Sequence, residues 1–282
     1  MHPLTQLCAK AHSLLVSAIE RYQPKHIVSL FSGGHDSLVA THLASEAYKL
    51  DFACHIDTGF GIPATHDYVT AVCAELEIRL RCYSAPTYRA PDGILKPQLY
   101  RDLVLEHGFP GPPMHTMMYQ RLKERPLRQM IRGLSRARTD RVLLVSGIRA
   151  SESQRRGRRN SAIQVWEGTK VWVAPLWDFS KFDVNAYIEH YNIPRNPVVD
   201  ALHKSGECLC GAFAKPGEKE EIRFWYPDVA ARIDRLEEEV QARGFEWGWG
   251  QKRPKERRSR GSIPEAALCA SCSLLKQDGG SP

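Results

Sequence analysis

Two adjacent glycines followed by an aspartate and a serine stand in the stretch Ser32-Gly33-Gly34-His35-Asp36-Ser37. Because glycine has no Cβ atom, the backbone of Gly33 and Gly34 can approach a ligand closely and can adopt positive φ angles. The amide N–H groups of such a turn point at one spot, and the dipole of a following helix adds partial positive charge there. The hydroxyl groups of Ser32 and Ser37 supply further donors. The pattern therefore predicts an anion site, and we call residues 32–37 the phosphate loop.

Asp36 is the acidic member of the phosphate loop, and its carboxylate could hold Mg²⁺ against phosphate oxygens. The loop contains no lysine, so it is not the phosphate loop of the common nucleoside triphosphatases. A simpler interpretation stays open, in which Asp36 or Ser37 only caps the helix that follows.

A buried strand and a helix must flank the phosphate loop if it is to hold a ligand. Residues 27–31 form an apolar run of the length expected for one buried parallel strand, and residues 38–44 continue at helical spacing. A second strand is predicted over residues 52–56, and loops after the carboxyl ends of parallel strands form the ligand crevice. We therefore expect Asp57 and Thr58 beside the phosphate loop, although capping the next helix is an alternative role for Asp57.

Arginines follow a later strand, which we predict over residues 141–146. Arg149 and Arg156 come after its carboxyl end, and a guanidinium can grip phosphate or sulfate through two parallel hydrogen bonds. We expect these side chains to face the same crevice as the phosphate loop. The catalytic candidates are therefore Asp36, Asp57, Arg149 and Arg156.

Strands alternate with helices through about residue 195, which predicts an α/β fold with a doubly wound, mainly parallel sheet. Further helices are expected over residues 4–22, 66–76, 183–191 and within 218–243, and further strands over 79–83 and, at an edge, 171–176.

Two regions are expected along the chain. Residues 1–200 would form the nucleotide-binding domain, with an N-terminal helix and an irregular insertion at 84–118 that is rich in proline and glycine. Residues 201–282 would form a small helical, cysteine-rich appendage that binds a metal or a cluster.

The composition limits the classes of protein to which the chain can belong. The chain has 282 residues, 43% of them hydrophobic, and a formal net charge of +7. This charge favours anionic ligands such as nucleotides or nucleic acid. We find no signal peptide and no apolar run long enough to span a bilayer, so we expect a cytoplasmic protein without a membrane partner. In that compartment cysteines are thiols or metal ligands.

The full string Ser-Gly-Gly-x-Asp-Ser after an apolar strand resembles the PP-loop of the adenine nucleotide alpha-hydrolase superfamily. Four further blocks follow in an order that resembles the phosphoadenosine phosphosulfate reductase family over roughly residues 25–215. These blocks are His55-Ile56-Asp57-Thr58-Gly59, Leu122-Lys123-Glu124-Arg125-Pro126-Leu127, Gly147-Ile148-Arg149 with Glu152, Ser153 and Arg156, and the segment from Ala174 to Pro197.

The resemblance implies a nucleotide site that binds ATP with Mg²⁺. The phosphate loop would hold the phosphates or a sulfate, and Gly147, Arg149, Glu152 and Arg156 would complete the anion pocket. The residues expected near the nucleoside are Ile56, Asp57, Thr58 and Gly59.

Two features make the chain resemble the ATP pyrophosphatase and sulfurtransferase members more closely than the true sulfonucleotide reductases. Reductases end in a Glu-Cys-Gly motif whose cysteine attacks the sulfate sulfur, whereas residues 277–282 read Gln-Asp-Gly-Gly-Ser-Pro. The adenylyl-sulfate branch has adjacent cysteines before its basic block, where residues 116–119 read Thr-Met-Met-Tyr. The expected reaction is cleavage of ATP at the α-phosphate to adenylate a substrate. The alternatives are a thiol-dependent reductase and a non-catalytic protein that binds a nucleotide or nucleic acid.

Four cysteines occur as two close pairs, Cys208 with Cys210 and Cys269 with Cys272. Close pairs separated by a long loop are one way in which four thiolates converge on one metal. The site fits a [4Fe–4S] cluster, which relatives with sulfur chemistry often hold, or alternatively Zn²⁺. Unrelated buried thiols are a further alternative. The other cysteines, Cys8, Cys54, Cys73 and Cys82, are expected on core faces.

Basic segments suggest partners beyond the nucleotide substrate. Residues 119–141 and 251–260 are rich in lysine and arginine, and each is either a solvated surface or a contact for nucleic acid. Trp247 and Trp249 would offer stacking faces beside the second segment. A sulfur-donor protein and a second copy of the chain in a homodimer are further expected partners.

Overall fold

The computed structural model describes residues 3–85, 88–89, 95–96, 99–137, 139–152, 161–166 and 169–252. The chain divides into two compact units. The first comprises Met1–Ile56, Pro63–Tyr83 and Leu127–Glu207, and the second comprises Asp57–Ile62, Ser84–Pro126 and the chain from Cys208 onward. The sequence suggested one division near residue 200, whereas the structure groups the insertion with the C-terminal part of the chain.

A mainly parallel six-stranded sheet forms the centre of the first unit, in the order β3-β2-β1-β6-β8-β7. β1 pairs in parallel with β2 on one side and with β6 on the other, and β6 pairs in parallel with β8. β7 is antiparallel to β8. The strands are β1 (His26–Leu30), β2 (Phe52–Asp57), β3 (Leu80–Ser84), β6 (Val142–Val145), β7 (Ile163–Trp166) and β8 (Lys170–Val173).

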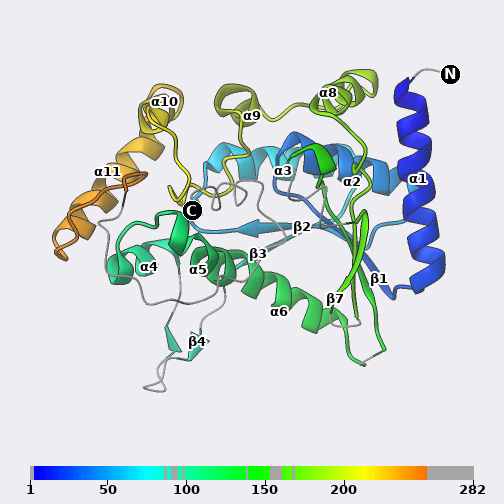
Figure 1. Ribbon diagram of the computed structural model, residues 1–282, viewed down its shortest axis with the longest axis horizontal. Helices are drawn as coiled ribbons and strands as arrows, with labels where there is room; N and C mark the ends of the chain where they lie inside the picture. Colours follow the sequence, from blue (N-terminus) through cyan, green and yellow to red (C-terminus); the bar gives the residue numbers. More distant parts are fainter. Residues whose placement is uncertain are drawn as a thin grey trace, which may run out of the picture. The chain divides into compact units, whose positions relative to one another are not determined.

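The sheet is covered on both faces, which is why its central strands are continuous apolar runs. All four residues of β6 are buried. Helices α2 and α3 lie on one side of the sheet and α6 on the other (Figure 1). The helices of this unit are α1 (Pro3–Tyr22), α2 (His35–Ala47), α3 (Pro63–Glu75), α6 (Arg125–Leu134), α8 (Lys181–His190) and α9 (Pro197–Leu202).

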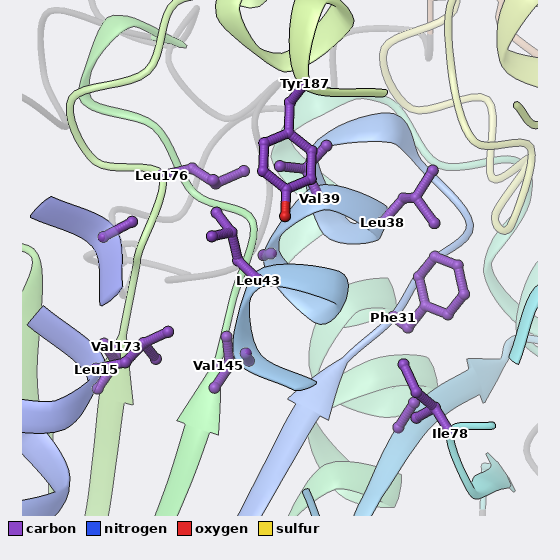
Figure 2. Close-up of a cluster of buried hydrophobic side chains, with 14 of the residues drawn as sticks. Leu15, Phe31, Leu38, Val39, Leu43, Ile78, Val145, Val173, Leu176 and Tyr187 are labelled. Atoms are coloured by element: carbon purple, nitrogen blue, oxygen red, sulfur yellow. The ribbon is translucent and has the colours of Figure 1, made fainter. Parts of the chain in front are cut away.

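The principal core of the first unit joins one face of the sheet to helices α1, α2, α3 and α8. Val145 and Val173 project from neighbouring strands toward Leu43 of α2, and Tyr187 of α8 packs over Val39 (Figure 2). This core holds α2 firmly, so the residues at its N-terminus have a fixed position relative to the strand ends.

The second unit is mainly helical in the residues that the structure describes. It contains the short antiparallel pair β4 (Tyr88–Arg89) and β5 (Leu95–Lys96). Its helices are α4 (Tyr100–His107), α5 (His115–Tyr119), α10 (Glu218–Trp225) and α11 (Pro227–Gln241), with a 3₁₀ turn at Pro112–Met114 and a π-helical turn at Gln120–Glu124.

The structure confirms the expected α/β class and corrects several local predictions. The strand predicted at the edge, β8, is internal, because the unpredicted strand β7 covers it. The insertion contains helix α4, and the helical region 218–243 is two helices that divide before Pro227. Cys82 is exposed, whereas Cys54 and Cys73 are buried as expected.

No helix in the described ranges is long and apolar enough to cross a membrane.

Two valines of the sheet test whether burial in this core determines stability. Val145 of β6 is fully buried, whereas Val165 of β7 is 45% exposed. Val145→Ala should lower the free energy of unfolding by about 2–3 kcal/mol, because it removes buried apolar groups and leaves a cavity. The matched change Val165→Ala should cost about 0.5 kcal/mol or less. Urea denaturation of both variants measures the difference, and equal losses would contradict the assigned core.

Candidate functional site

The phosphate loop lies where the topology of the sheet reverses direction. It directly follows β1, and the next strands along the chain, β2 and β3, lie on one side of β1. The chain then crosses to β6 and β8 on the other side. In open parallel sheets, ligands bind at the carboxyl ends of the strands at such a reversal.

The two glycines of the phosphate loop have different roles. Gly33 has φ +81°, in the left-handed region, and a Cβ placed there would lie 2.7 Å from Thr65 Cγ2. Gly34 precedes α2 with φ −77° and ψ 153°, and a Cβ there would meet only ordinary contacts. The prediction of positive φ is therefore confirmed for Gly33 and wrong for Gly34.

The serines of the phosphate loop bind the loop itself. Ser37 Oγ donates to the carbonyl of Gly34 (2.8 Å) and lies 3.1 Å from Ser32 Oγ. The amide of Ser32 donates to Ser37 Oγ (3.3 Å). These bonds close the turn, so both hydroxyl groups shape the loop before any ligand is bound.

The first turn of α2 presents amide donors. Within the part of the chain that the structure describes, no acceptor pairs with the backbone N–H groups of His35 and Asp36. Because the first amides of a helix lack intrahelical partners, they and the helix dipole favour an anion at this end. The turn therefore has the geometry of an anion site.

Asp36 belongs to a cluster of four charged side chains. Arg149 Nη2 donates to Asp36 Oδ2 (3.3 Å), and Arg149 Nε lies 3.3 Å from Asp36 Oδ1. Lys181 Nζ lies 3.6 Å from Asp36 Oδ1, and Glu152 Oε1 lies 3.9 Å from Arg149 Nη2. Arg149 is 8% exposed, whereas the side chain of Lys181 is 52% exposed. The sequence predicted three of these residues, and Lys181 is an addition from the start of α8.

Gly147 brings the loop after β6 against the start of α2. A Cβ at Gly147 would lie 2.5 Å from the carbonyl carbon of Asp36 and 2.6 Å from the amide nitrogen of Ser37. Only glycine permits this approach of the two backbones. Gly147 therefore allows Arg149 to reach Asp36.

His35, which the sequence left without a role, is buried beside an ion pair. Its Nδ1 lies 3.5 Å from Arg195 Nη2, and Arg195 binds Asp200 at 2.7 Å. Burial lowers the pKa of His35 to about 4, and the positive charge of Arg195 contributes. His35 is therefore neutral near pH 7, and Nδ1 accepts from the guanidinium.

Asn196 is a second residue that sequence reasoning missed. Its Nδ2 donates to the carbonyl of Gly33 (2.8 Å), and its Oδ1 accepts from the amide of Val198 (2.9 Å) as the N-cap of α9. The Asn-Pro pair at 196–197 is a helix-start signal that could have revealed the cap. Nothing local could have revealed the contact with Gly33.

The residues expected near the nucleoside stand at the end of β2. Ile56 is half-buried in the first unit, whereas Asp57, Thr58 and Gly59 belong to the second unit. Asp57 Oδ1 accepts from the amide of Gly59 (2.8 Å). This bond makes a local turn, so Asp57 is not the cap of α3, which begins at Pro63.

Cys208 and Cys210 lie together in the second unit. A hydrogen bond with the Cys208 thiol is the largest cause that raises the pKa of Cys210, and burial adds to it. The backbone between them is anchored, because Leu209 N donates to Phe60 O (2.9 Å) and Trp249 Nε1 donates to Leu209 O (2.6 Å). The two sulfurs are therefore brought together on a fixed segment.

Several predicted residues lie outside the described ranges, namely Arg156, Ser153, Cys269, Cys272 and the basic segment from residue 253. Among the residues that are described, no three His, Cys, Asp or Glu side chains form a group able to hold a metal ion.

Of the two tryptophans expected to offer stacking faces, Trp249 is 4% exposed and has no accessible face. Trp247 is half-buried, and its Nε1 donates to Phe109 O (2.8 Å). In the segment 119–141, Arg121, Lys123 and Arg128 have partners within the chain.

The site consists of a glycine turn that begins a helix at the reversal point of a mainly parallel sheet, together with Arg149 from the loop after β6, the strand beside β1. These features define an α/β protein of the PP-loop class. The family model described as the phosphoadenosine phosphosulfate reductase domain matches residues 26–210, more than half of the chain. The chain belongs to this family.

Two relatives show the extent of the similarity. The phosphoadenosine 5'-phosphosulfate reductase of Xanthomonas axonopodis pv. citri is 25% identical over 73% of this chain and 80% of its own length. The enzyme of the same name from Shewanella oneidensis is 24% identical over 63% and 66%. The crystal structure of phosphoadenylyl-sulfate reductase from Candida auris, a phosphate complex, aligns with a TM-score of 0.48 and 20% identity over 70% of this chain and 89% of that one.

The two loop glycines predict contrasting effects of an added methyl group. Gly33→Ala should lower the free energy of unfolding by about 1–3 kcal/mol, because alanine is strained at φ +81° and its Cβ meets Thr65. Gly34→Ala should change it by about 0.5 kcal/mol or less, because its backbone is extended and its Cβ contacts are ordinary. Thermal and urea unfolding of the two variants provide the measurement. A larger loss for Gly34→Ala would show that the loop has a different conformation.

Proposed function

We propose that this protein binds ATP at the phosphate loop and cleaves it at the α-phosphate, adenylating a substrate for sulfur transfer or nucleic-acid modification. A nucleophile of the substrate forms a bond to the α-phosphorus while the bond to the bridging oxygen breaks, and pyrophosphate leaves with that electron pair. The observation that carries the proposal is Arg149, which is buried and held 3.3 Å from Asp36 at the amide-rich start of α2. Amides and a fixed guanidinium together stabilise charge that develops on phosphate oxygens.

The charge balance of the site supports Mg²⁺ as the metal that accompanies ATP. Arg149 and Lys181 contribute two positive charges, and Asp36 and Glu152 contribute two negative charges, so the cluster sums to zero. A triphosphate adds several negative charges, which the amides alone would neutralise only in part. Asp36 Oδ1 makes ion pairs with Arg149 and Lys181 but no hydrogen bond, and a carboxylate oxygen is a ligand that Mg²⁺ prefers. Asp36 is the residue that would hold the metal, with Glu152 as its nearest acidic neighbour in the cluster.

A second candidate function is thiol-dependent reduction of a sulfonucleotide, which the names of the curated relatives favour. Cys208 or Cys210 would then attack the sulfate sulfur. The raised pKa of Cys210 disfavours that thiol as the nucleophile, because the thiolate is the reactive form, and leaves Cys208 as the candidate. We rank ATP cleavage first because the phosphate loop and the buried Arg149 form an anion site.

Product analysis separates these functions. Incubation with Mg²⁺ and ATP labelled at the α-phosphate should release AMP and pyrophosphate, with water as a slow acceptor. Formation of sulfite from phosphoadenosine phosphosulfate and a thiol, without AMP from ATP, would support the reductase instead. Tight binding of ATP with no products would indicate a non-catalytic nucleotide-binding protein.

The variant Asp36→Asn tests the metal role of the carboxylate. It should lower the rate of pyrophosphate release by roughly 10²-fold, because it removes the charge that would hold Mg²⁺ beside the phosphates. Asp140→Asn is the control. Asp140 also binds a lysine (Lys25, 3.0 Å), but it precedes β6, whereas Arg149 and the site follow the carboxyl end of that strand. Wild-type turnover in Asp36→Asn would contradict the role.

We also propose that Cys208 and Cys210, with Cys269 and Cys272, hold a [4Fe–4S] cluster, or alternatively Zn²⁺. The convergence of the first two thiols on an anchored backbone supports this. The second pair lies outside the described residues, so its part in the site is an expectation from the sequence.

Metal analysis of protein purified without oxygen tests the four-cysteine site. About four irons with matching sulfide per chain indicate the cluster, and about one zinc indicates a structural site. Cys210→Ser and Cys269→Ser should each lose the metal and lower stability, because metal binding contributes folding free energy. The control Cys82→Ser, at an exposed cysteine, should retain it. Metal-free wild-type protein would show that these residues are ordinary thiols.

A further inference from the structure

The side chain of Asn196 is fully buried and uses both of its polar ends. Its amide group donates to the carbonyl of Gly33 (2.8 Å), and its oxygen accepts from Val198 N (2.9 Å). The second contact is an ordinary helix cap, which serine or aspartate could also make. The first contact joins the segment before α9 to the backbone of the phosphate loop.

The contact determines which way one peptide of the phosphate loop faces. The carbonyl of Gly33 and the N–H of Gly34 belong to the same trans peptide, so they point in opposite directions. Holding the carbonyl toward Asn196 therefore turns the N–H of Gly34 away from it. The nearest acceptor for that N–H is Ser32 Oγ at 3.5 Å, the outer limit of a hydrogen bond. The Gly34 amide is thus turned away from Asn196 and faces Ser32 Oγ, with which it is only weakly engaged.

The glycines by themselves would not keep this orientation. A peptide between two glycines can rotate with little steric penalty, because neither residue carries a Cβ. The rotated peptide would present the carbonyl oxygen of Gly33 in place of an N–H, and that oxygen would repel a phosphate. A donor on the opposite side is therefore needed to select the conformation that binds an anion.

Asn196 is itself held in place by its surroundings. Tyr68 Oη donates to the carbonyl of Pro194 (2.8 Å), and Arg195 binds Asp200 through Nε and Nη2. These contacts fix the chain on both sides of Asn196, so its amide is a rigid support for the loop and not a mobile side chain.

We propose that Asn196 is a positioning residue, which orients the Gly33–Gly34 peptide so that the Gly34 N–H is presented to a phosphate of the nucleotide. The inference rests on the proposed function of the loop in binding nucleotide phosphates. Asn196 itself does not contact the nucleotide and acts only through the peptide.

The test uses Asn196→Ser in the full-length protein, because serine keeps the helix cap but is too short to reach Gly33. The control is Asn192→Ser, at an exposed position in the turn that follows α8, for which no contact with the phosphate loop is observed among the described residues. Calorimetry measures the affinity for Mg²⁺-ATP, for pyrophosphate and for adenosine, and unfolding curves measure stability. In protein labelled with ¹³C and ¹⁵N at glycine, NMR reports the Gly33 carbonyl and the Gly34 amide without any ligand.

Asn196→Ser should weaken ATP and pyrophosphate binding roughly tenfold or more, with adenosine affinity close to that of the control. Some loss of stability is expected as well, because the buried carbonyl of Gly33 loses its donor. The Gly33 carbonyl and Gly34 amide resonances should shift in Asn196→Ser and not in Asn192→Ser.

Unshifted resonances, or ATP affinity within twofold of wild type, would overturn the inference while leaving the proposed function intact. Wild-type protein that binds neither ATP nor pyrophosphate would refute the proposed function, and the inference with it. If Asn196→Ser does not fold, Asn196→Thr, which also keeps a capping hydroxyl and lacks the amide donor, provides the same comparison without adding a charge.

Discussion

The contact of Gly147 with the peptide between Asp36 and Ser37 is the constraint on which the site depends. A single Cβ at this position would overlap the backbone of α2. Because the two backbones touch, the loop after β6 has one available position, and it places Arg149 against Asp36. The left-handed turn at Gly33 is the complementary requirement, since it directs the chain from β1 into α2. Two glycines far apart in sequence thus define one site.

The charges of this site are balanced before any ligand is present. Arg149 is buried, and a buried cation without a partner would be strongly destabilising, so Asp36 and Glu152 stabilise it in the folded protein. Lys181 is half exposed and stands at the first residue of α8, where it can move without disturbing the core. The site therefore combines one fixed cation with one that can adapt to a bound anion.

Most of the first unit could be predicted from the sequence, because its strands and helices have strong local patterns. The apolar runs at β1, β2 and β6 and the helical spacing of α1 agree with the structure within about two residues at each end, and the helical spacing predicted over residues 38–44 lies within α2. β7 and α4 were missed, since the first is a half-exposed strand without a pattern and the second lies among prolines and glycines. The second unit joins distant segments through contacts such as Phe60 with Tyr100, whose ring centroids are 4.3 Å apart, and Tyr100 with the carbonyl of Cys210.

The sequence by itself determined the phosphate loop, because glycine conformation and the start of a helix are local properties of neighbouring residues. It also indicated Arg149, since a residue after a parallel strand faces the same edge of the sheet as the loop. Only the tertiary structure decided the roles of His35, Lys181 and Asn196. Asn196 meets Gly33 across 163 positions of sequence, and Lys181 meets Asp36 from another helix. The hydrophobic periodicity of the sequence does not reveal such contacts, because they depend on how the strands are ordered in the sheet and where each helix packs.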